Sequence, residues 1–231
     1  MRYKSARALQ NMLRNAIRST VTGCVTAFAF SSALSAELSV RIVDAHSQAI
    51  PDAVVIATPL GSATPRAPAP TTAVMDQIGK AFVPIVLVVQ TGTPVIFPNS
   101  DTVAHQVYSF SPARRFELPL YRGQVHPPIT FDHPGLVILG CNIHDNMVGY
   151  IYVTDSPYSG LSDARGQWAI ADLPVGDYEV SVWSHRMPRD SASVSQHISV
   201  NSSTPAEVQF RLKDTLRPAV GTPQGTRLRD Y

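Results

Sequence analysis

Short runs of β-branched and aromatic residues, separated by turn residues, constrain the fold of this chain most. After residue 36 almost no stretch has the apolar spacing of an amphipathic helix. Runs such as SVRIVD (39–44), VVIAT (54–58) and VGYIYVT (148–154) instead have the length and composition of strands. The 19 prolines in 231 residues suit one or two compact domains with many turns. The sequence therefore predicts an all-β protein.

The predicted strands form three groups along the chain. The first comprises residues 39–44 and 54–58, and it is followed by PLGSATPRAPAPTT (59–72), a linker or exposed loop. The second lies between Val74 and Val153, with strands at 85–90, 94–98, 106–110, 129–132, 136–141 and 148–154. The third begins after Asp155, with strands at 167–171, 178–183, 197–200 and 206–212. Residues 213–231 have little to bury, so we predict a flexible tail.

The first 36 residues are typical of an export signal. They begin with basic residues, continue with the uncharged run TVTGCVTAFAFSSALSA (20–36) and end in small residues, which predicts cleavage near Ser35 or Ala36. A mitochondrial transit peptide is the competing interpretation, and a lipoprotein cleavage site at Cys24 is less favoured. The apolar part is too short and too rich in Ser and Thr to span a membrane, so we expect no stable membrane insertion. We predict a periplasmic or otherwise exported protein.

The charge distribution argues against a nucleic-acid partner. Five of the 19 basic residues lie in the first 36, which leaves 14 basic against 17 acidic residues in the remainder. A chain that neutralises phosphates needs a concentrated basic face, and none is indicated here.

Cys141 is the one cysteine that remains after signal removal, so it cannot form an internal disulfide. In an oxidising compartment an unpaired thiol is open to oxidation unless it is buried or bound to a metal. The stretch LGCNIHDNMVG (139–149) places His144 and Met147 at three-residue intervals after it. Thiolate and imidazole are strong ligands for copper and zinc, whereas a thioether suits copper. His105, which follows a polar loop and precedes a strand, qualifies as a second histidine.

Residues 80–110 and 129–153 resemble a cupredoxin of the amicyanin and plastocyanin type. The shared features are a strand, Gly turn, strand, Asn-x-Asp and His order, a Phe-x-x-Pro-Gly turn at 131–135 and the C-x-x-H-x-x-M spacing. Exported proteins labelled methylamine-utilisation proteins share the GCNIH run. The resemblance implies a Greek-key β-sandwich over residues 74–153, with one copper ion bound by His105, Cys141 and His144 in a plane and by Met147 axially. The chain departs from the family at Gln106, where Asn is usual, and in a ligand loop without prolines.

Residues 37–72 and 155–212 resemble a carboxypeptidase-regulatory-like β-sandwich. The resemblance rests on SVRIVDAHSQAIPDAVVIAT and on SDARGQWAIADLPVGDYEVSVW, with its D-x-x-G turn and L-P-x-G-x-Y hairpin. We therefore expect a small, discontinuous Ig-like sandwich into which the cupredoxin is inserted, or with which it packs. In the simpler alternative, residues 37–58 supply outer strands to the cupredoxin itself.

Several other interpretations of these residues stay open. Cys141 could be a buried apolar thiol, and a Cys/His hydrolase oriented by Asp145 is a weak option because its groups would sit on one short loop. His126 and His133 could be additional ligands, although solvated loop histidines are commoner. We interpret His46, His185 and His197 as surface residues, and Arg114-Arg115 as a solvated turn rather than a docking patch.

We expect a one-electron carrier and no enzyme activity. The resemblance implies protein redox partners, by analogy a dehydrogenase and a c-type cytochrome, with His144 and nearby Ile143 at the docking surface. A copper-delivery protein without electron transfer is the alternative, and a structural protein with an empty site is the third hypothesis.

Overall fold

The computed structural model describes residues 35–61, 71–123, 126–188, 191–213 and 216–218, and these belong to one compact unit, Ala33–Tyr231. All 17 regular elements in these ranges are strands, so the prediction of an all-β fold is confirmed. No helix in the described ranges is long and apolar enough to cross a membrane. Residues 1–34 of the predicted export signal and most of the predicted tail lie outside the described residues, whereas Ser35 and Ala36 belong to the first strand, Ser35–Val43.

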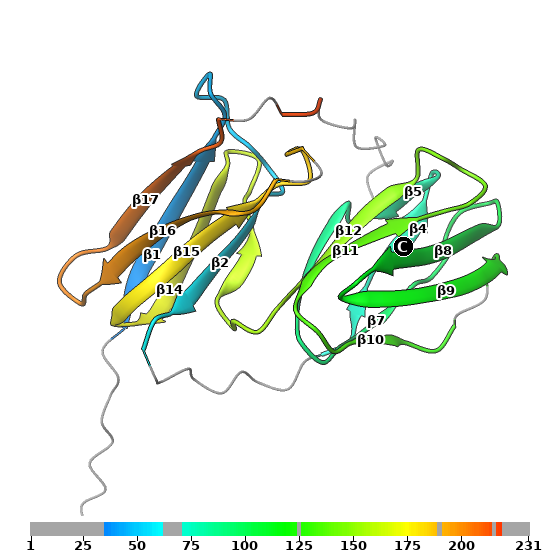
Figure 1. Ribbon diagram of the computed structural model, residues 1–231, viewed down its shortest axis with the longest axis horizontal. Coiled ribbons are helices and arrows are strands. Elements are labelled where there is room, and N and C mark those ends of the chain that lie inside the picture. Colours follow the sequence, from blue (N-terminus) through cyan, green and yellow to red (C-terminus); the bar gives the residue numbers. More distant parts are fainter. Residues whose placement is uncertain (1–34, 62–70, 124–125, 189–190, 214–215, 219–231) are drawn as a thin grey trace, which may run out of the picture. The chain divides into compact units, whose positions relative to one another are not determined.

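The strands of the first and third groups share two sheets (Figure 1). One has the order β14-β1-β17 and the other β13-β2-β15-β16. Their bounds are β1 Ser35–Val43, β2 Val54–Pro59, β13 Ser159–Leu161, β14 Gln167–Pro174, β15 Gly176–Trp183, β16 Val194–Val200 and β17 Ala206–Arg211. Segments from both ends of the chain thus complete one sandwich, because β1 pairs with β17 in parallel and β2 pairs with β15. The domain limits 37–72 with 155–212, and 74–153, remain a prediction.

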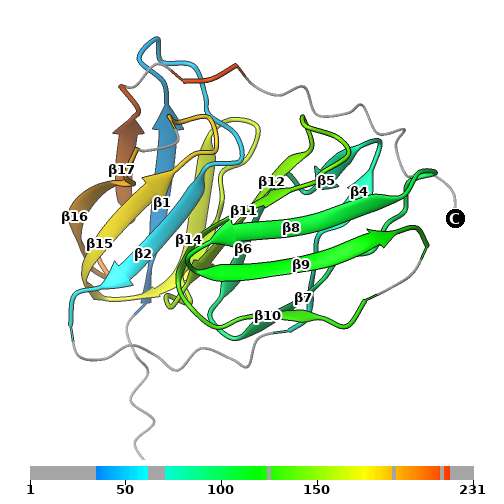
Figure 2. The same cartoon turned by 45° about the vertical axis from the view of Figure 1, so that its right-hand side comes forward.

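The strands of the second group form a separate pair of sheets and a short hairpin (Figure 2). The larger sheet has the order β6-β12-β11-β8-β9, the smaller has the order β10-β7-β3, and β4 pairs with β5. Their bounds are β3 Ala73–Val74, β4 Asp76–Ile78, β5 Ala81–Val83, β6 Val86–Gln90, β7 Thr93–Ile96, β8 His105–Ser111, β9 Arg114–Tyr121, β10 Ile129–Phe131, β11 Gly135–Gly140 and β12 Val148–Thr154.

Alternating side chains of these strands fill two hydrophobic cores. The core of the second sandwich includes Phe97, Phe131 and Val137, together with Cys141 and Met147. The other core fills the first sandwich, and Tyr150 of β12 joins it on the outer face of the larger sheet, where its ring lies 5.5 Å from that of Trp183. Burial of apolar surface on both faces of β12 therefore couples the two sandwiches.

Each predicted strand corresponds to an observed one whose ends differ by no more than four residues. The short strands β3, β4, β5 and β13 and the longer strand β9 were not predicted. The interpretation of Arg114-Arg115 as a turn is wrong, since both residues lie in β9. This strand contains Pro119 and several charged residues, which are typical of the edge of a sheet, where one row of backbone groups faces solvent. An edge strand of this composition lacks the apolar alternation on which the prediction depended.

We expect Gly166→Ala to destabilise the first sandwich by about 2–3 kcal/mol. Gly166 ends the Asp163 turn with φ 71°, and an added Cβ would lie 2.4 Å from the backbone oxygen of Ile42. That oxygen cannot move without disturbing β1. Urea unfolding followed by circular dichroism measures the change.

Gly123→Ala is the matched control for this substitution. Gly123 has φ 66°, but an added Cβ there would meet nothing within 4 Å. The free energy of unfolding of this variant should fall by only about 1 kcal/mol, the cost of a positive φ for alanine. Equal losses in the two variants would show that the contact with Ile42 does not matter.

Candidate metal centre

The pairing of β8 with β11 brings the predicted ligands together. The strands are antiparallel, with Gly140 opposite Tyr108, so the loop after β11 lies beside the start of β8. His105 is the first residue of β8, and Cys141 directly follows β11. There is no room for a side chain at Gly140, because an added Cβ would lie 2.6 Å from the ring of Tyr108. The present position of the Tyr108 ring therefore depends on a glycine before the cysteine.

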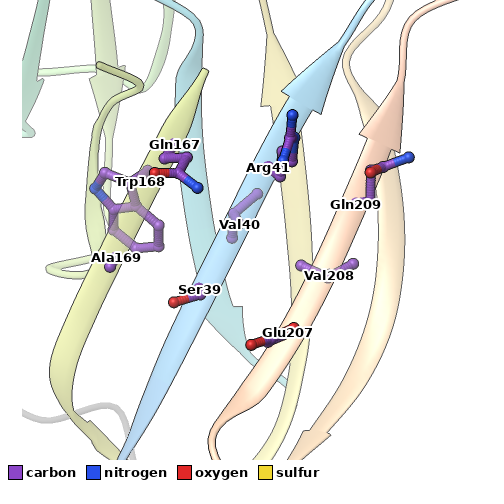
Figure 3. Close-up of a pocket in the computed structure, with 9 residues that line it drawn as sticks. All are labelled: Ser39, Val40, Arg41, Gln167, Trp168, Ala169, Glu207, Val208 and Gln209. Carbon is purple, nitrogen blue, oxygen red and sulfur yellow. The ribbon is translucent and has the colours of Figure 1, made fainter. Parts of the chain in front are cut away.

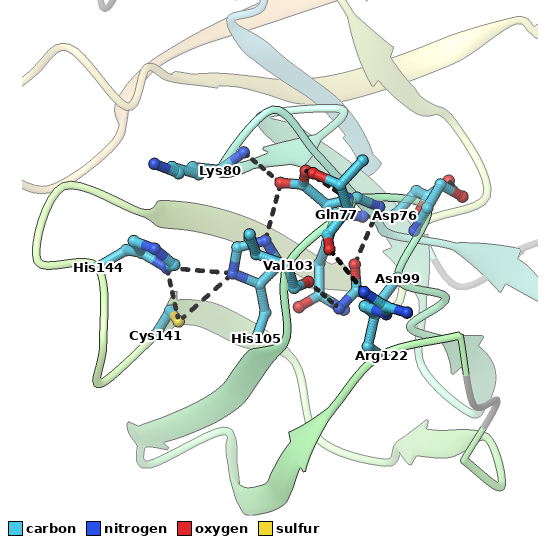
Figure 4. A network of polar contacts seen from close by, with 12 residues as sticks. Asp76, Gln77, Lys80, Asn99, Val103, His105, Arg122, Cys141 and His144 are labelled. Atoms are coloured by element: carbon cyan, nitrogen blue, oxygen red, sulfur yellow. Dashed lines mark hydrogen bonds and ion pairs between the residues drawn. The ribbon is translucent and has the colours of Figure 1, made fainter.

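Three of the four predicted ligands converge on one point (Figure 4). His105 Nδ1 lies 3.2 Å from His144 Nδ1, and Cys141 Sγ lies 4.0 Å from the former and 3.8 Å from the latter. His105 and Cys141 are buried, whereas His144 is half-buried. The site thus has two inner donors and one donor that reaches toward solvent.

Asp101 fixes the orientation of His105. Its Oδ2 lies 2.9 Å from His105 Nε2 and also accepts the backbone N–H of Lys80 at 2.8 Å. The hydrogen bond to His105 is the main cause that lowers the pKa of Asp101 from 3.8 to about 2, so the carboxylate is ionised at neutral pH. An ionised carboxylate only accepts, so Nε2 carries the proton and Nδ1 of a neutral ring offers its lone pair to the site.

The ligand loop is built from two successive hydrogen-bonded turns. The N–H of His144 donates to the carbonyl of Cys141 at 3.4 Å, and the N–H of Met147 donates to the carbonyl of His144 at 2.9 Å. These turns hold a loop that has no proline. Met147 is 1% exposed and packs in the same hydrophobic cluster as Cys141. The fourth predicted ligand is therefore an interior residue of the same loop.

A buried network holds the polar loop that precedes His105. Asn99 Nδ2 donates to the carbonyls of Tyr121 at 2.8 Å and Val103 at 3.1 Å. The hydroxyl of Tyr121 donates to the carbonyl of Phe97 at 2.6 Å and accepts from Gln77 Nε2 at 2.5 Å. Burial raises the pKa of Tyr121 to about 12, so it remains a donor. Hydrogen bonds thus connect the loop to β9 and β4.

Sequence reasoning identified Asp101 as part of an Asn-x-Asp motif but missed its role. A carboxylate four residues before a ligand histidine was the available signal. Gln106 donates to Glu117 on β9 at 2.5 Å, so it does not join the two ligand loops. His133 is exposed, and the ring of His126 packs on Tyr121 with centroids 4.6 Å apart. Neither belongs to the His-Cys-His group that the described residues form.

A hollow of about 520 Å³ lies on the outer face of the β14-β1-β17 sheet, away from the metal centre (Figure 3). Arg41, Gln167 and Glu207 are exposed on this face. None of these residues takes part in the contacts around Cys141, and we assign no function to this surface.

No known family profile matches this chain, and no curated protein matches it. Among solved structures, a purple cupredoxin from Nitrosopumilus maritimus is 23% identical over 36% of this chain and 99% of its own, with a TM-score of 0.32. An amicyanin variant is 22% identical over 42% of this chain and 97% of its own, with a TM-score of 0.33. A copper-containing nitrite reductase from Thermus scotoductus is 28% identical over 42% of this chain, with a TM-score of 0.34, and the match spans 25% of the reductase. These likenesses cover 36–42% of this chain, and they say nothing of the strands of the first sandwich.

We expect the metal-free protein to lose stability as the pH falls from about 4 toward about 2. The pKa of Asp101 is lower in the folded state than its ordinary value of 3.8, so its stabilising contribution is complete above that value and disappears on protonation. Urea unfolding of native protein and Asp101→Asn between pH 2 and pH 7 measures this contribution.

The difference in stability between native protein and Asp101→Asn should shrink as the pH falls through this window. Asp145→Asn is the control, because the side chain of Asp145 is exposed and, among the described residues, forms no hydrogen bond or ion pair. A native-to-variant difference that stays constant with pH would contradict the role given to the Asp101 carboxylate.

Proposed function

We propose that this chain is an exported type 1 copper protein of the cupredoxin class that carries single electrons between redox partners. His105, Cys141 and His144 would hold one copper ion, with Met147 as a weak axial ligand. The observation that carries the proposal is the convergence of one sulfur and two imidazole nitrogens within 4.8 Å of one another. Copper, when bound, supplies a one-electron couple between Cu(II) and Cu(I).

The donor set fits such an ion in number, kind and spacing. Bond lengths of about 2.0–2.3 Å place the donors around a common ion about 3–4 Å apart. The separations of 3.2, 3.8 and 4.0 Å fall in this range. Two histidines and one cysteine with a nearby methionine are the ligand set of a blue-copper site. Without a metal, Nδ1–H of a neutral His144 ring can donate to Nδ1 of His105. Metal binding would need that proton on Nε2 of His144 instead, and would release the proton of the Cys141 thiol.

The surroundings of the donors favour electron transfer with little movement. Cys141 is 3% exposed, and His105 is held by Asp101 from behind. The turns that end at His144 and Met147 fix the loop between the ligands. A site that changes little between oxidation states keeps the reorganisation cost of each transfer low. Rigid ligands therefore serve a carrier better than a protein that must release its metal.

His144 offers the route to a partner. It is the half-buried member of the group, and its neighbour Ile143 is 52% exposed. An apolar surface beside an exposed ligand suits brief docking of another redox protein. By analogy, the partners would be a dehydrogenase as electron donor and a c-type cytochrome as acceptor, in the periplasm. As a carrier that returns unchanged after each transfer, the chain would not be an enzyme.

Copper delivery is the second candidate function, because an exposed histidine could also pass the metal to an acceptor. The two functions differ in what happens on reduction. A carrier keeps its copper through repeated cycles, whereas a delivery protein loses Cu(I) to an acceptor.

Copper titration of the metal-free mature protein should produce an intense blue thiolate-to-copper band and a narrow copper hyperfine splitting. His105→Ala should abolish the band because it removes one of the three converging donors. Met147→Leu should keep the band and shift it, because a thioether is a weak ligand. Visible absorption and electron paramagnetic resonance measure both effects. His133→Ala is the matched control, since this exposed histidine lies outside the group.

Cyclic voltammetry of the copper-loaded protein, with and without a Cu(I) chelator, separates the two functions. The proposal predicts a reversible one-electron wave that survives repeated cycles. Loss of copper to the chelator on the first reduction would favour delivery, and a protein that never turns blue would exclude the carrier.

A further inference from the structure

A second cavity, of about 240 Å³, lies behind the ligand loop. Asp145 and Asn146 of that loop line it, together with Arg186 and Arg217 from the other sandwich and the segment that follows it. Its remaining walls are mostly apolar: Ile85, Val148, Tyr150, His185 and Pro218. The cavity does not include the three donors of the metal centre.

Two buried nitrogens among its lining residues have no hydrogen-bond partner. They are Nε of Arg217 and Nδ1 of His185. The interpretation of His185 as a surface residue is wrong, because it is only 8% exposed. A buried donor without a partner costs about 1–3 kcal/mol, so the packing around these two side chains is not optimal by itself. Both atoms have less than 1 Å² of accessible surface, so a ligand in the cavity would contact the other nitrogens of Arg217.

The backbone around Arg217 holds its side chain in place. The N–H of Arg217 donates to the carbonyl of Arg186 at 2.7 Å, and Arg186 Nε donates to the carbonyl of Arg217 at 2.9 Å. One terminal nitrogen of Arg217 also donates to the carbonyl of His185. The guanidinium is thus oriented by the protein before any ligand arrives, which reduces the entropy lost on binding.

The charges facing the cavity favour an anion. Arg186 and Arg217 are always protonated, and the one carboxylate in the lining is that of Asp145, which is exposed and therefore screened by solvent. Burial lowers the pKa of His185 below its usual 6.5, so its ring is neutral near pH 7 and can donate through Nδ1. The net charge of the lining is positive by one.

We propose that this cavity binds a small organic carboxylate. The guanidinium of Arg217 would hold the carboxylate, since its planar set of N–H donors matches a planar carboxylate. Ile85, Val148 and Tyr150 would contact the apolar part of the ligand. The apolar walls favour such an acid over inorganic phosphate, which has no apolar surface to bury.

The test titrates metal-free native protein with benzoate, its neutral analogue benzamide and inorganic phosphate. Calorimetry measures the affinity, and the Nε–H signals of the arginines in ¹H–¹⁵N NMR spectra report the contact. Since no metal is present, the result does not depend on the proposed copper function. We expect saturable benzoate binding that shifts the Arg217 Nε–H signal, weaker binding of phosphate and none of benzamide.

Arg217→Gln should weaken benzoate binding by about tenfold or more, because it removes a charge-assisted hydrogen bond. Arg217→Lys keeps the charge but loses the planar N–H donors of the guanidinium, so it should weaken binding by less. This variant replaces Arg217→Gln in the test if Arg217→Gln does not fold. Asp145→Asn should strengthen binding. Arg165→Gln is the matched control, since Arg165 is exposed and lies outside the cavity lining.

Three results would overturn the proposal. The first is the absence of saturable benzoate binding to native protein. The second is unchanged affinity in the folded Arg217 variants. The third is binding of benzamide or phosphate as tight as that of benzoate, which would show that the cavity recognises apolar bulk or any anion instead.

Discussion

The antiparallel pairing of β8 with β11 is the constraint on which the candidate metal centre depends. It places the loop after Gly140 beside the start of β8 and so brings Cys141 and His144 to His105. The pairing is itself supported by burial, because both strands contribute side chains to the core of the second sandwich. Ligands on three separate positions of the chain are thus fixed by the same apolar packing that stabilises the sheet.

Hydrogen bonds then fix the orientation of the side chains that this pairing brings together. Asp101 turns the lone pair of His105 Nδ1 toward the sulfur, and two turns hold the ligand loop. Asn99 and Tyr121 anchor the loop that carries Asp101. The same physical logic applies to the cavity behind the ligand loop, where backbone contacts orient Arg217 and leave its Nε unpaired.

The sequence predicted most of the strands, and the grouping of Cys141 with His144, from local patterns: β-branched runs, turn residues and three-residue spacing. That His105 joins them was implied by the resemblance to cupredoxins, since it lies 36 residues before Cys141 in the chain. The sequence did not predict β9, whose charged edge-strand composition hides it, or the burial of His185, which depends on packing between segments far apart in the chain. The role of Asp101 also escaped prediction, since a motif shows that a carboxylate is near a histidine but not which nitrogen it meets. Non-local packing is what a single sequence encodes least visibly.

In the proposed function, copper binds to donors that are already assembled and that stay in place during electron transfer. X-ray absorption at the copper edge of the loaded protein, in both oxidation states, is the decisive test. We expect one short sulfur ligand and two imidazole nitrogen ligands in Cu(II) and Cu(I) alike, with only small changes in distance. Absence of the sulfur ligand, or loss of an imidazole on reduction at neutral pH, would contradict the proposed function.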